Sequence, residues 1–176
     1  GDGSLLNLVE TVIHRDIPIM GINFGRLGFL TAGLAADLES LLDSYLQEDT
    51  VIYKRMLLKT IIKQGDNTIV RHGLNDVVIA CPDISRVFTL SVKVGEEPLF
   101  RLRGDGLIIS TPTGSTAHSL SAGGALVDPN LFAMLLTPLS PQSLSTRPLV
   151  VRPDAVVEVR VKKDYGQAKV LCDGQT

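Results

Sequence analysis

Residues 88–94, with the sequence FTLSVKV, decide the fold class of the second part of the chain. Apolar residues at positions 88, 90, 92 and 94 alternate with polar Thr89, Ser91 and Lys93. Strict alternation is typical of a strand that buries one face. Residues 157–161, VEVRV, repeat the pattern, and turn-forming residues such as Gly65-Asp66-Asn67 separate the strand-like runs. The sequence therefore predicts that residues 51–176 form a mainly antiparallel, β-rich C-terminal domain.

Residues 1–50 have a different pattern. Leucines and valines recur with a helical period over residues 4–14 and again over 34–46, and the apolar stretch at 17–22 separates them. Two helices around a buried strand predict a partial α/β domain of the Rossmann-like kind. Because the first residue is Gly1 and the opening reads like the middle of a motif, we expect a piece of a longer protein.

Composition narrows the function classes. Hydrophobic residues make up 44% of the 176 positions, which excludes a wholly disordered chain. Lys and Arg number 17 against 19 Asp and Glu, so the net charge of 17 − 19 = −2 provides no field for a polyanion, and we expect no nucleic-acid partner. No apolar run approaches the roughly 20 residues that span a bilayer, so no membrane partner is expected either.

The two cysteines, Cys81 and Cys172, do not make a disulfide framework, and no signal peptide precedes them. We expect reduced thiols in a cytoplasmic protein. Neither cysteine nor any of the three histidines has the spacing of a metal site, so no metal ligands are predicted.

Residues 106–127 contain no Asp, Glu, Lys or Arg, and residues 110–124 hold seven Ser or Thr and three Gly. Hydroxyls supply hydrogen-bond donors and acceptors without net charge, and glycine lets a ligand approach the backbone. Apolar residues flank the segment on both sides. These features favour a buried, hydroxyl-lined binding loop over a solvated linker.

Shorter motifs are ambiguous one at a time. Residues 1–4, GDGS, run into a helix and suit a phosphate, with Asp2 as a base, but they also suit a plain helix cap. Asn75 and Asp76 in LNDVVI suit a ribose or an ordinary turn before a strand. The segments RGDG at 103–106 and CDGQ at 172–175 are each, alone, interpreted as turns.

Taken together, these motifs are far more specific. In chain order the sequence carries GDGSLL, GINFGRLGFLT, RMLL, LNDVVI, DGLIISTPTGSTAHSLSAGGALV, TPLSPQSLSTRPLVV and CDGQ. This set resembles the NAD kinase family over essentially the whole chain. The resemblance implies an ATP-dependent enzyme that phosphorylates the adenosine-ribose 2′-hydroxyl of NAD to give NADP. It also implies an N-terminal α/β domain and a β-rich C-terminal domain that enclose the nucleotide.

The resemblance also implies roles for individual residues. Asp2 matches the family's proton acceptor, and His118 stands where the family usually has Tyr. The residues that match substrate-binding positions are Gly3, Asn75, Asp76, Arg86, Arg103, Asp105, Thr116, Ala117, His118, Ser119, Leu120, Ser121 and Gln175.

The implied ligands are NAD and ATP with Mg²⁺, and polyphosphate stays open as an alternative donor. The resemblance further implies a homo-oligomer. Since the family's first and last strands are missing, this piece alone can be inactive. Two alternatives stay open: a lipid or sugar kinase that shares the Gly-Asp-Gly turn, and a nucleotide-binding module without turnover.

Overall fold

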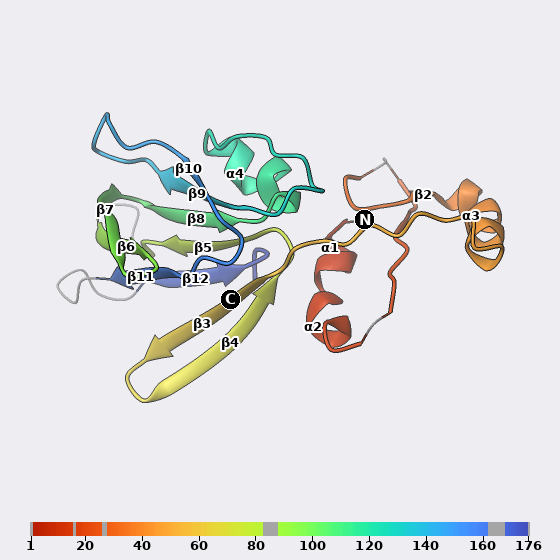
Figure 1. Ribbon diagram of the computed structural model, residues 1–176, viewed down its shortest axis with the longest axis horizontal. Helices are drawn as coiled ribbons and strands as arrows, with labels where there is room; N and C mark the ends of the chain where they lie inside the picture. Colours follow the sequence, from red (N-terminus) through yellow and green to blue (C-terminus); the bar gives the residue numbers. More distant parts are fainter. Residues whose placement is uncertain (1, 16, 26–27, 83–87, 162–167, 176) are drawn as a thin grey trace. The chain divides into compact units, whose positions relative to one another are not determined.

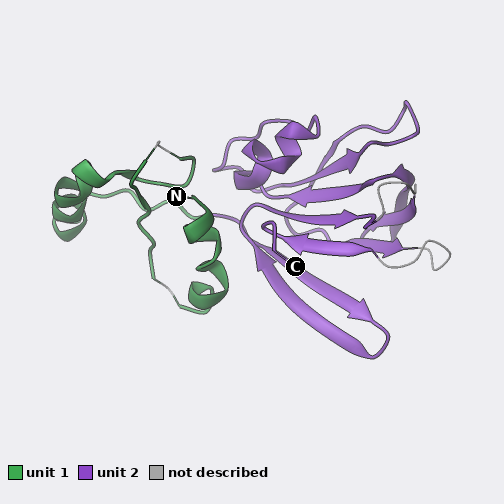
Figure 2. Ribbon diagram, turned by 180° about the vertical axis from the view of Figure 1, so that it is seen from behind, with its two compact units in different colours: residues 1–54 green, residues 55–176 purple. Residues whose placement is uncertain are grey.

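The computed structural model describes the chain except for residues 1, 16, 26–27, 83–87, 162–167 and 176. The chain forms two compact units, Gly1–Lys54 (unit 1) and Arg55–Thr176 (unit 2), which Figure 2 colours separately. Each unit is described by itself below.

Unit 1 is built from short elements. Its helices are α1 (Asp2–Leu6), α2 (Val9–Val12) and α3 (Leu38–Leu46), with a 3₁₀ turn, η1 (Ala35–Asp37), before α3. The two-residue strands β1 (Ile22–Asn23) and β2 (Gly33–Leu34) pair in parallel. The described part of unit 1 therefore has a parallel pair and flanking helices, but it does not confirm the Rossmann-like sheet expected from the sequence.

Two predicted elements of unit 1 are shorter in the structure than the sequence indicated. Instead of one helix over 4–14, the chain forms α1 and α2, because the Leu8 N–H bonds to Leu5 O at 3.0 Å, three residues back, and this tight turn ends α1. The predicted strand at 17–22 is reduced to its last residue. Pro18 has no N–H to give to a ladder, and Ile17 and Ile19 are exposed. The helix expected at 34–46 is confirmed over residues 38–46 as α3, while Leu34 belongs to β2 and residues 35–37 form η1.

Unit 2 is a β structure, as predicted. A five-stranded antiparallel sheet has the order β10-β9-β8-β5-β12, and a three-stranded antiparallel sheet has the order β11-β6-β7 (Figure 1). The bounds in the first sheet are β10 (Leu149–Val151), β9 (Met134–Leu139), β8 (Gly106–Ser110), β5 (Asp76–Ala80) and β12 (Lys169–Cys172). Those in the second are β11 (Val157–Val161), β6 (Phe88–Val94) and β7 (Glu97–Gly104). A separate hairpin joins β3 (Leu58–Gln64) to β4 (Asn67–Gly73).

The two alternating runs that predicted the fold pair with each other. Val159 of β11 lies opposite Val92 of β6, and Val161 lies opposite Leu90. Their buried faces join one core with alternate residues of the five-stranded sheet. The buried members are Leu58, Val77, Ile79, Phe88, Leu90, Val92, Leu102, Leu107, Ile109, Met134, Leu136 and Cys172.

The second face of the five-stranded sheet is covered as well. Ile108 and Leu135 point away from the first core, yet both are buried. The short helices η2 (Thr113–Thr116) and α4 (His118–Ser121) follow β8, and α4 packs against that strand. Burial on both sides explains why β8, GLIIS, does not alternate in polarity. The hydroxyl-rich segment is therefore anchored to the centre of the sheet.

Candidate active site

In unit 1, the carboxylate of Asp2 is held by a backbone loop. Its Oδ2 accepts the N–H of Phe29 at 3.0 Å and its Oδ1 accepts the N–H of Leu30 at 3.2 Å. Thr31 Oγ1 accepts the N–H of Gly28 at 3.2 Å and steadies the loop. Because each carboxylate oxygen has more than one lone pair, Asp2 keeps acceptor capacity for a proton or a ligand.

Gly28 makes this arrangement possible. A Cβ built at Gly28 would lie 2.8 Å from Asp2 Cγ and 2.9 Å from Oδ2, closer than real Cβ atoms come. Asp2 of GDGSLL and Phe29 and Leu30 of GINFGRLGFLT are far apart in the sequence, and only the structure connects them. Gly3 is exposed, and a Cβ built on it would meet nothing within 4 Å. Gly1 lies outside the described residues.

In unit 2, Asp173 binds the loop that carries Asn75 and Asp76. Its Oδ2 accepts the N–H of Leu74 at 2.8 Å, and its Oδ1 accepts the N–H groups of Asn75 at 2.8 Å and Asp76 at 3.1 Å. In return, the Asp173 N–H donates to Asp76 O at 2.9 Å. The loop before β5 is therefore fixed by residues almost 100 positions further along the chain.

Asp173 occupies the turn that the sequence predicted at CDGQ. Cys172 and Gln175 exchange N–H···O bonds of 2.8 Å, and the two residues between them have positive φ, +49° at Asp173 and +77° at Gly174. Positive φ at both central positions defines a type I′ turn, for which Asp-Gly is a preferred pair. The sequence predicted the turn and, through the family resemblance, a role for Gln175, but it did not predict one for Asp173.

The hydroxyl-rich segment holds the same loop from its other side. The N–H of Thr111 donates to Asn75 O at 2.9 Å, and the Thr111 hydroxyl donates to Leu74 O at 2.5 Å. A Cβ built at Gly114 would overlap the backbone of Asn75, with Asn75 Cα at 2.7 Å. Residues 74–76 are thus clamped between the Asp173 turn and the start of η2.

Asp76 is buried, with 4% of its surface exposed, and no hydrogen bond to its carboxylate is found among the described residues. The pKa of Asp76 is raised from 3.8 to about 6, mainly by burial and further by the negative charge of Asp173, while His118 acts in the opposite direction. His118 is therefore close enough to influence Asp76 electrostatically. The structure brings together Asn75, Asp76, Asp173 and His118.

Residues 116–121 divide by exposure. His118, Leu120 and Ser121 are exposed, and Thr116 and Ala117 are half-buried. Ser119 is fully buried, and its hydroxyl pairs with Thr137 Oγ1 at 2.8 Å. Residues 110–115 and Ser119 are buried as expected, so the first half of the segment is no solvated linker, whereas its second half is mostly half-buried or exposed. Several of its hydroxyls bond to the protein itself.

Arg103 and Asp105 are not brought to this cluster. Both are exposed, and both precede β8, whereas Asp76 pairs with Ser110 at the end of that strand. Ala80 pairs with Gly106 at the start, so the two groups are separated by the length of β8, roughly 13 Å for four residues. Arg86 lies outside the described residues.

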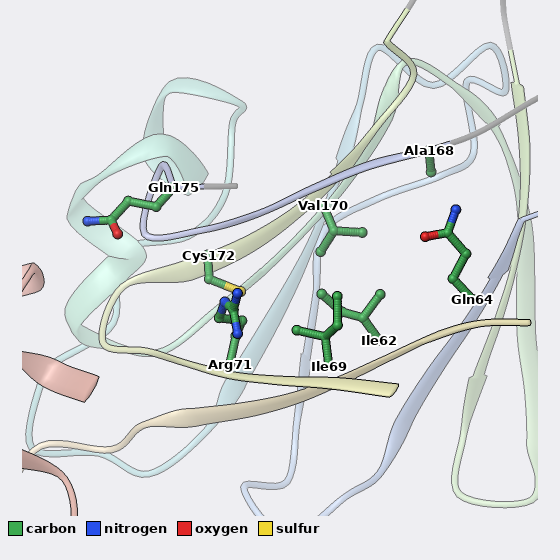
Figure 3. Close-up of a pocket in the computed structure, with 8 residues that line it drawn as sticks. All are labelled: Ile62, Gln64, Ile69, Arg71, Ala168, Val170, Cys172 and Gln175. Atoms are coloured by element: carbon green, nitrogen blue, oxygen red, sulfur yellow. The ribbon is translucent and has the colours of Figure 1, made fainter. Parts of the chain in front are cut away.

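Gln175 stands at one end of a small cavity of about 190 Å³ between the β3–β4 hairpin and β12 (Figure 3). Ile62 and Ile69 of the hairpin and Val170 of β12 line its middle, and Gln64 lies at the other end. The Gln175 side chain thus lines this cavity, while the backbone of the same residue closes the turn that carries Asp173.

Among the described residues, no group of three or more His, Cys, Asp or Glu side chains is placed to hold a metal ion. Within the same part of the chain, no helix has the length and apolar character needed to cross a membrane.

Comparison with known protein families shows that the two parts of the chain match the two domains of one class of kinase. Residues 1–50 match the ATP-NAD kinase N-terminal domain, and residues 74–176 match the ATP-NAD kinase C-terminal domain. The chain belongs to the NAD kinase family, as the sequence motifs suggested.

Individual relatives agree. An NAD kinase of Heliobacterium modesticaldum is 44% identical over 176 residues, which are 99% of this chain and 62% of that protein. An NAD kinase of Symbiobacterium thermophilum is 41% identical, with the same coverage of 99% and 62%. The chain thus spans less than two thirds of the length of these relatives.

Solved structures share the fold. The crystal structure of yeast NADH kinase complexed with NADH matches with a TM-score of 0.92 and 31% identity, over 99% of this chain and 52% of that one. An NAD kinase from Archaeoglobus fulgidus in complex with ATP matches with a TM-score of 0.84 and 30% identity, over 100% and 66%.

Proposed function

We propose that the protein transfers the γ-phosphoryl group of ATP to the adenosine-ribose 2′-hydroxyl of NAD and so makes NADP. The observation that carries this proposal is membership of the NAD kinase family over both parts of the chain. The geometry supports it, because a held carboxylate and a clamped polar loop are the parts that such a transfer needs.

Asp2 is the proposed proton acceptor. A ribose hydroxyl is a weak nucleophile at neutral pH and needs a base as its oxygen attacks phosphorus. The new O–P bond forms while the bond to the β-phosphate oxygen breaks, ADP leaves, and the hydroxyl proton moves to Asp2. The N–H groups of Phe29 and Leu30 orient the carboxylate for this step. A placed base contributes about 10²–10⁴-fold to the rate.

Unit 2 supplies the proposed NAD contacts. The amide of Asn75 and the carboxylate of Asp76 suit ribose hydroxyls, and no hydrogen bond to the buried Asp76 carboxylate is found among the described residues. The exposed His118 offers an imidazole face on which a base can stack. Further proposed contacts are Gly3, Arg86, Arg103, Asp105, Thr116, Ala117, Ser119, Leu120, Ser121 and Gln175.

Mg²⁺ enters the proposal as part of the ATP substrate. Phosphoryl transfer depends on positioning and on neutralising the charge of the phosphates, which Mg²⁺ supplies when it is bound to them. Polyphosphate presents the same phosphoanhydride chemistry and is an alternative donor.

Several wider assignments belong to the same proposal. Residues 1–50 would be the partial, Rossmann-like phosphate domain and residues 51–176 the NAD-binding domain, in a cytoplasmic homo-oligomer. The family resemblance supports these assignments.

The test is NADP formation from NAD and Mg-ATP by the full-length protein and by its Asp2→Asn variant. The amide keeps the size of the side chain but removes the base. We expect product from the parent and a loss of at least about 10²-fold in kcat in the variant. NAD binding, measured by titration, stays within about tenfold because the lost group acts on the proton rather than on affinity.

Near-parent turnover by the Asp2→Asn variant would show that Asp2 is not the base. A parent that binds NAD but makes no product, with either donor, would support the nucleotide-binding module without turnover. A parent that phosphorylates a lipid or a sugar instead would support the other alternative.

A further inference from the structure

We propose that Asp173 is a positioning residue for NAD: its carboxylate holds residues 74–76 in the conformation that presents Asn75 and Asp76 to the dinucleotide. This inference rests on the proposed function, since it assigns a task within the same site. It adds a residue that the sequence motifs did not single out.

The backbone N–H groups of residues 74–76 need a hydrogen-bond acceptor from outside the sheet. The ladder of β5 with β8 begins at Asp76, which pairs with Ser110, so residues 74 and 75 lie before the paired region. Three consecutive N–H groups in this half-buried stretch converge on one carboxylate. Hydrogen bonds to an ionised acceptor are shorter and stronger than neutral ones, and buried N–H groups left without an acceptor are costly.

The turn and the loop also fit one another in shape. The N–H of Asp173 donates back to Asp76 O at 2.9 Å, which closes a two-way connection. Gly73, just before the loop, leaves room for it: a Cβ built there would lie 3.2 Å from Asp76 O and 3.3 Å from Asp173 Oδ1. Moving Asp173 would therefore move the backbone that sets where Asn75 and Asp76 lie.

Asp173 acts through its neighbours rather than on substrate. Both of its oxygens accept N–H groups of the loop, whereas no such bond is found for Asp76 in the described part of the chain. The two acidic residues thus have different roles. Asp173 fixes the conformation of residues 74–76, and Asp76 faces the ligand.

The informative variant is Asp173→Asn in the full-length protein. Asn tolerates positive φ as Asp does, so the type I′ turn at φ +49° is kept. An amide can still accept at one atom, but its NH₂ group replaces one acceptor and the charge is lost. The matched control is Asp66→Asn, the same chemical change in the exposed turn at the tip of the β3–β4 hairpin.

Three readouts are compared: amide hydrogen exchange at residues 74–76 without ligand, NAD affinity by titration, and steady-state kinetics. We expect faster exchange confined to residues 74–76 and NAD binding weakened about tenfold, as for the loss of a charge-assisted hydrogen bond. KM for NAD should rise about tenfold while kcat at saturating NAD falls less than about threefold, because the loop can still be ordered by substrate. Asp66→Asn should match the parent in all three.

The outcomes separate the inference from the function on which it rests. Unchanged NAD affinity in Asp173→Asn, with a parent that binds NAD, overturns the inference alone, whether or not exchange is faster. Equal losses in kcat and in the affinities for NAD and ATP, with exchange faster throughout unit 2, overturn it in favour of a general structural role. A parent that neither binds nor phosphorylates NAD overturns the proposed function and this inference together.

Discussion

Backbone N–H groups bind an aspartate carboxylate in both units, but the bonds serve opposite purposes. In unit 1 a loop, at Phe29 and Leu30, holds the side chain of Asp2. In unit 2 a side chain, that of Asp173, holds a loop. Asp2 accepts two N–H groups and keeps acceptor capacity for chemistry, whereas Asp173 accepts three and serves its neighbours. The number of such bonds thus differs between Asp2, the proposed proton acceptor, and Asp173, the proposed positioning residue.

The two regions also differ in what surrounds the held group. Asp2 lies in a unit whose described strands are two residues long. Asn75 and Asp76 lie where strand β5 of the five-stranded sheet begins, and hydrogen bonds hold them from two sides. Each region contains a glycine at the point of closest approach, Gly28 beside the Asp2 side chain and Gly114 beside the Asn75 backbone. Side chains can move aside, but a buried backbone cannot, so the same substitution should have different consequences.

The largest expected effect on stability is that of Gly114→Ala. Its new Cβ would overlap the backbone of Asn75, with Asn75 Cα at 2.7 Å, and neither segment can yield without breaking the clamp. We expect a loss of about 3 kcal/mol in the free energy of unfolding, as in overpacked cores. Urea unfolding measures it, and a loss below 1 kcal/mol would contradict the picture of a rigid clamp.

Gly28→Ala should instead reduce activity more than stability. The new methyl group would displace only the end of the Asp2 side chain, which can rotate away from Phe29 and Leu30. Because a displacement of about 1 Å can cost roughly 10²-fold in rate, kcat for NADP formation should fall by about that factor. The free energy of unfolding should change by less than about 1 kcal/mol.

The control for Gly28→Ala is Gly25→Ala in the same loop. Among the described residues, a Cβ there would meet only Asn23 Oδ1, at 4.0 Å, so kcat should stay near the parent value. Equal losses in the two variants would mean that the loop needs glycine for its own backbone and not to make room for Asp2.

Asp76→Asn should change the pH dependence of stability, by no more than the loss expected for Gly114→Ala. The pKa of Asp76 is raised from 3.8 to about 6 in the folded protein, first by burial and then by Asp173. The folded state therefore binds this proton more tightly than the unfolded state, and stability from this group is lost as the pH rises through 6. Removing the charge should make the variant more stable than the parent at pH 8, by about 1–3 kcal/mol.

That gain should disappear near pH 4, where Asp76 is protonated in the folded protein and increasingly so in the unfolded chain. Unfolding curves at pH 4, 6 and 8 measure the difference. A gain that does not change with pH, or a variant that is less stable at pH 8, would show that Asp76 carries no buried charge of this kind.

Regular periodicity made much of unit 2 predictable. The alternating runs at 88–94 and 157–161 became β6 and β11, and the first half of the uncharged segment, residues 106–115, is buried. The helix at 34–46 was also predictable because its leucines lie on one face. Unit 1 was harder: over residues 4–14 the apolar period is helical, yet a tight turn at Leu8 divides it.

The contacts that build the candidate site could not be predicted from local pattern. Phe29 and Leu30 meet Asp2 from 27 and 28 residues away, and Asp173 meets the loop from 97 to 99 residues away. Such bonds use backbone N–H groups, which every residue but proline has, so the sequence does not mark them. The Asp-Gly pair at 173–174 did predict a turn, but it did not predict that Asp173 binds residues 74–76.

The bond between Asp173 and residues 74–76 has a consequence for biosynthesis. During translation, the loop is complete as a sequence long before its acceptor exists, since the two are separated by 97 to 99 residues. At about 5–20 residues per second, the ribosome needs roughly 5–20 s to reach Asp173 after it has made the loop. The nascent chain can therefore begin its hairpins early, but the loop at residues 74–76 is completed only when the strand that ends in Cys172 has been made.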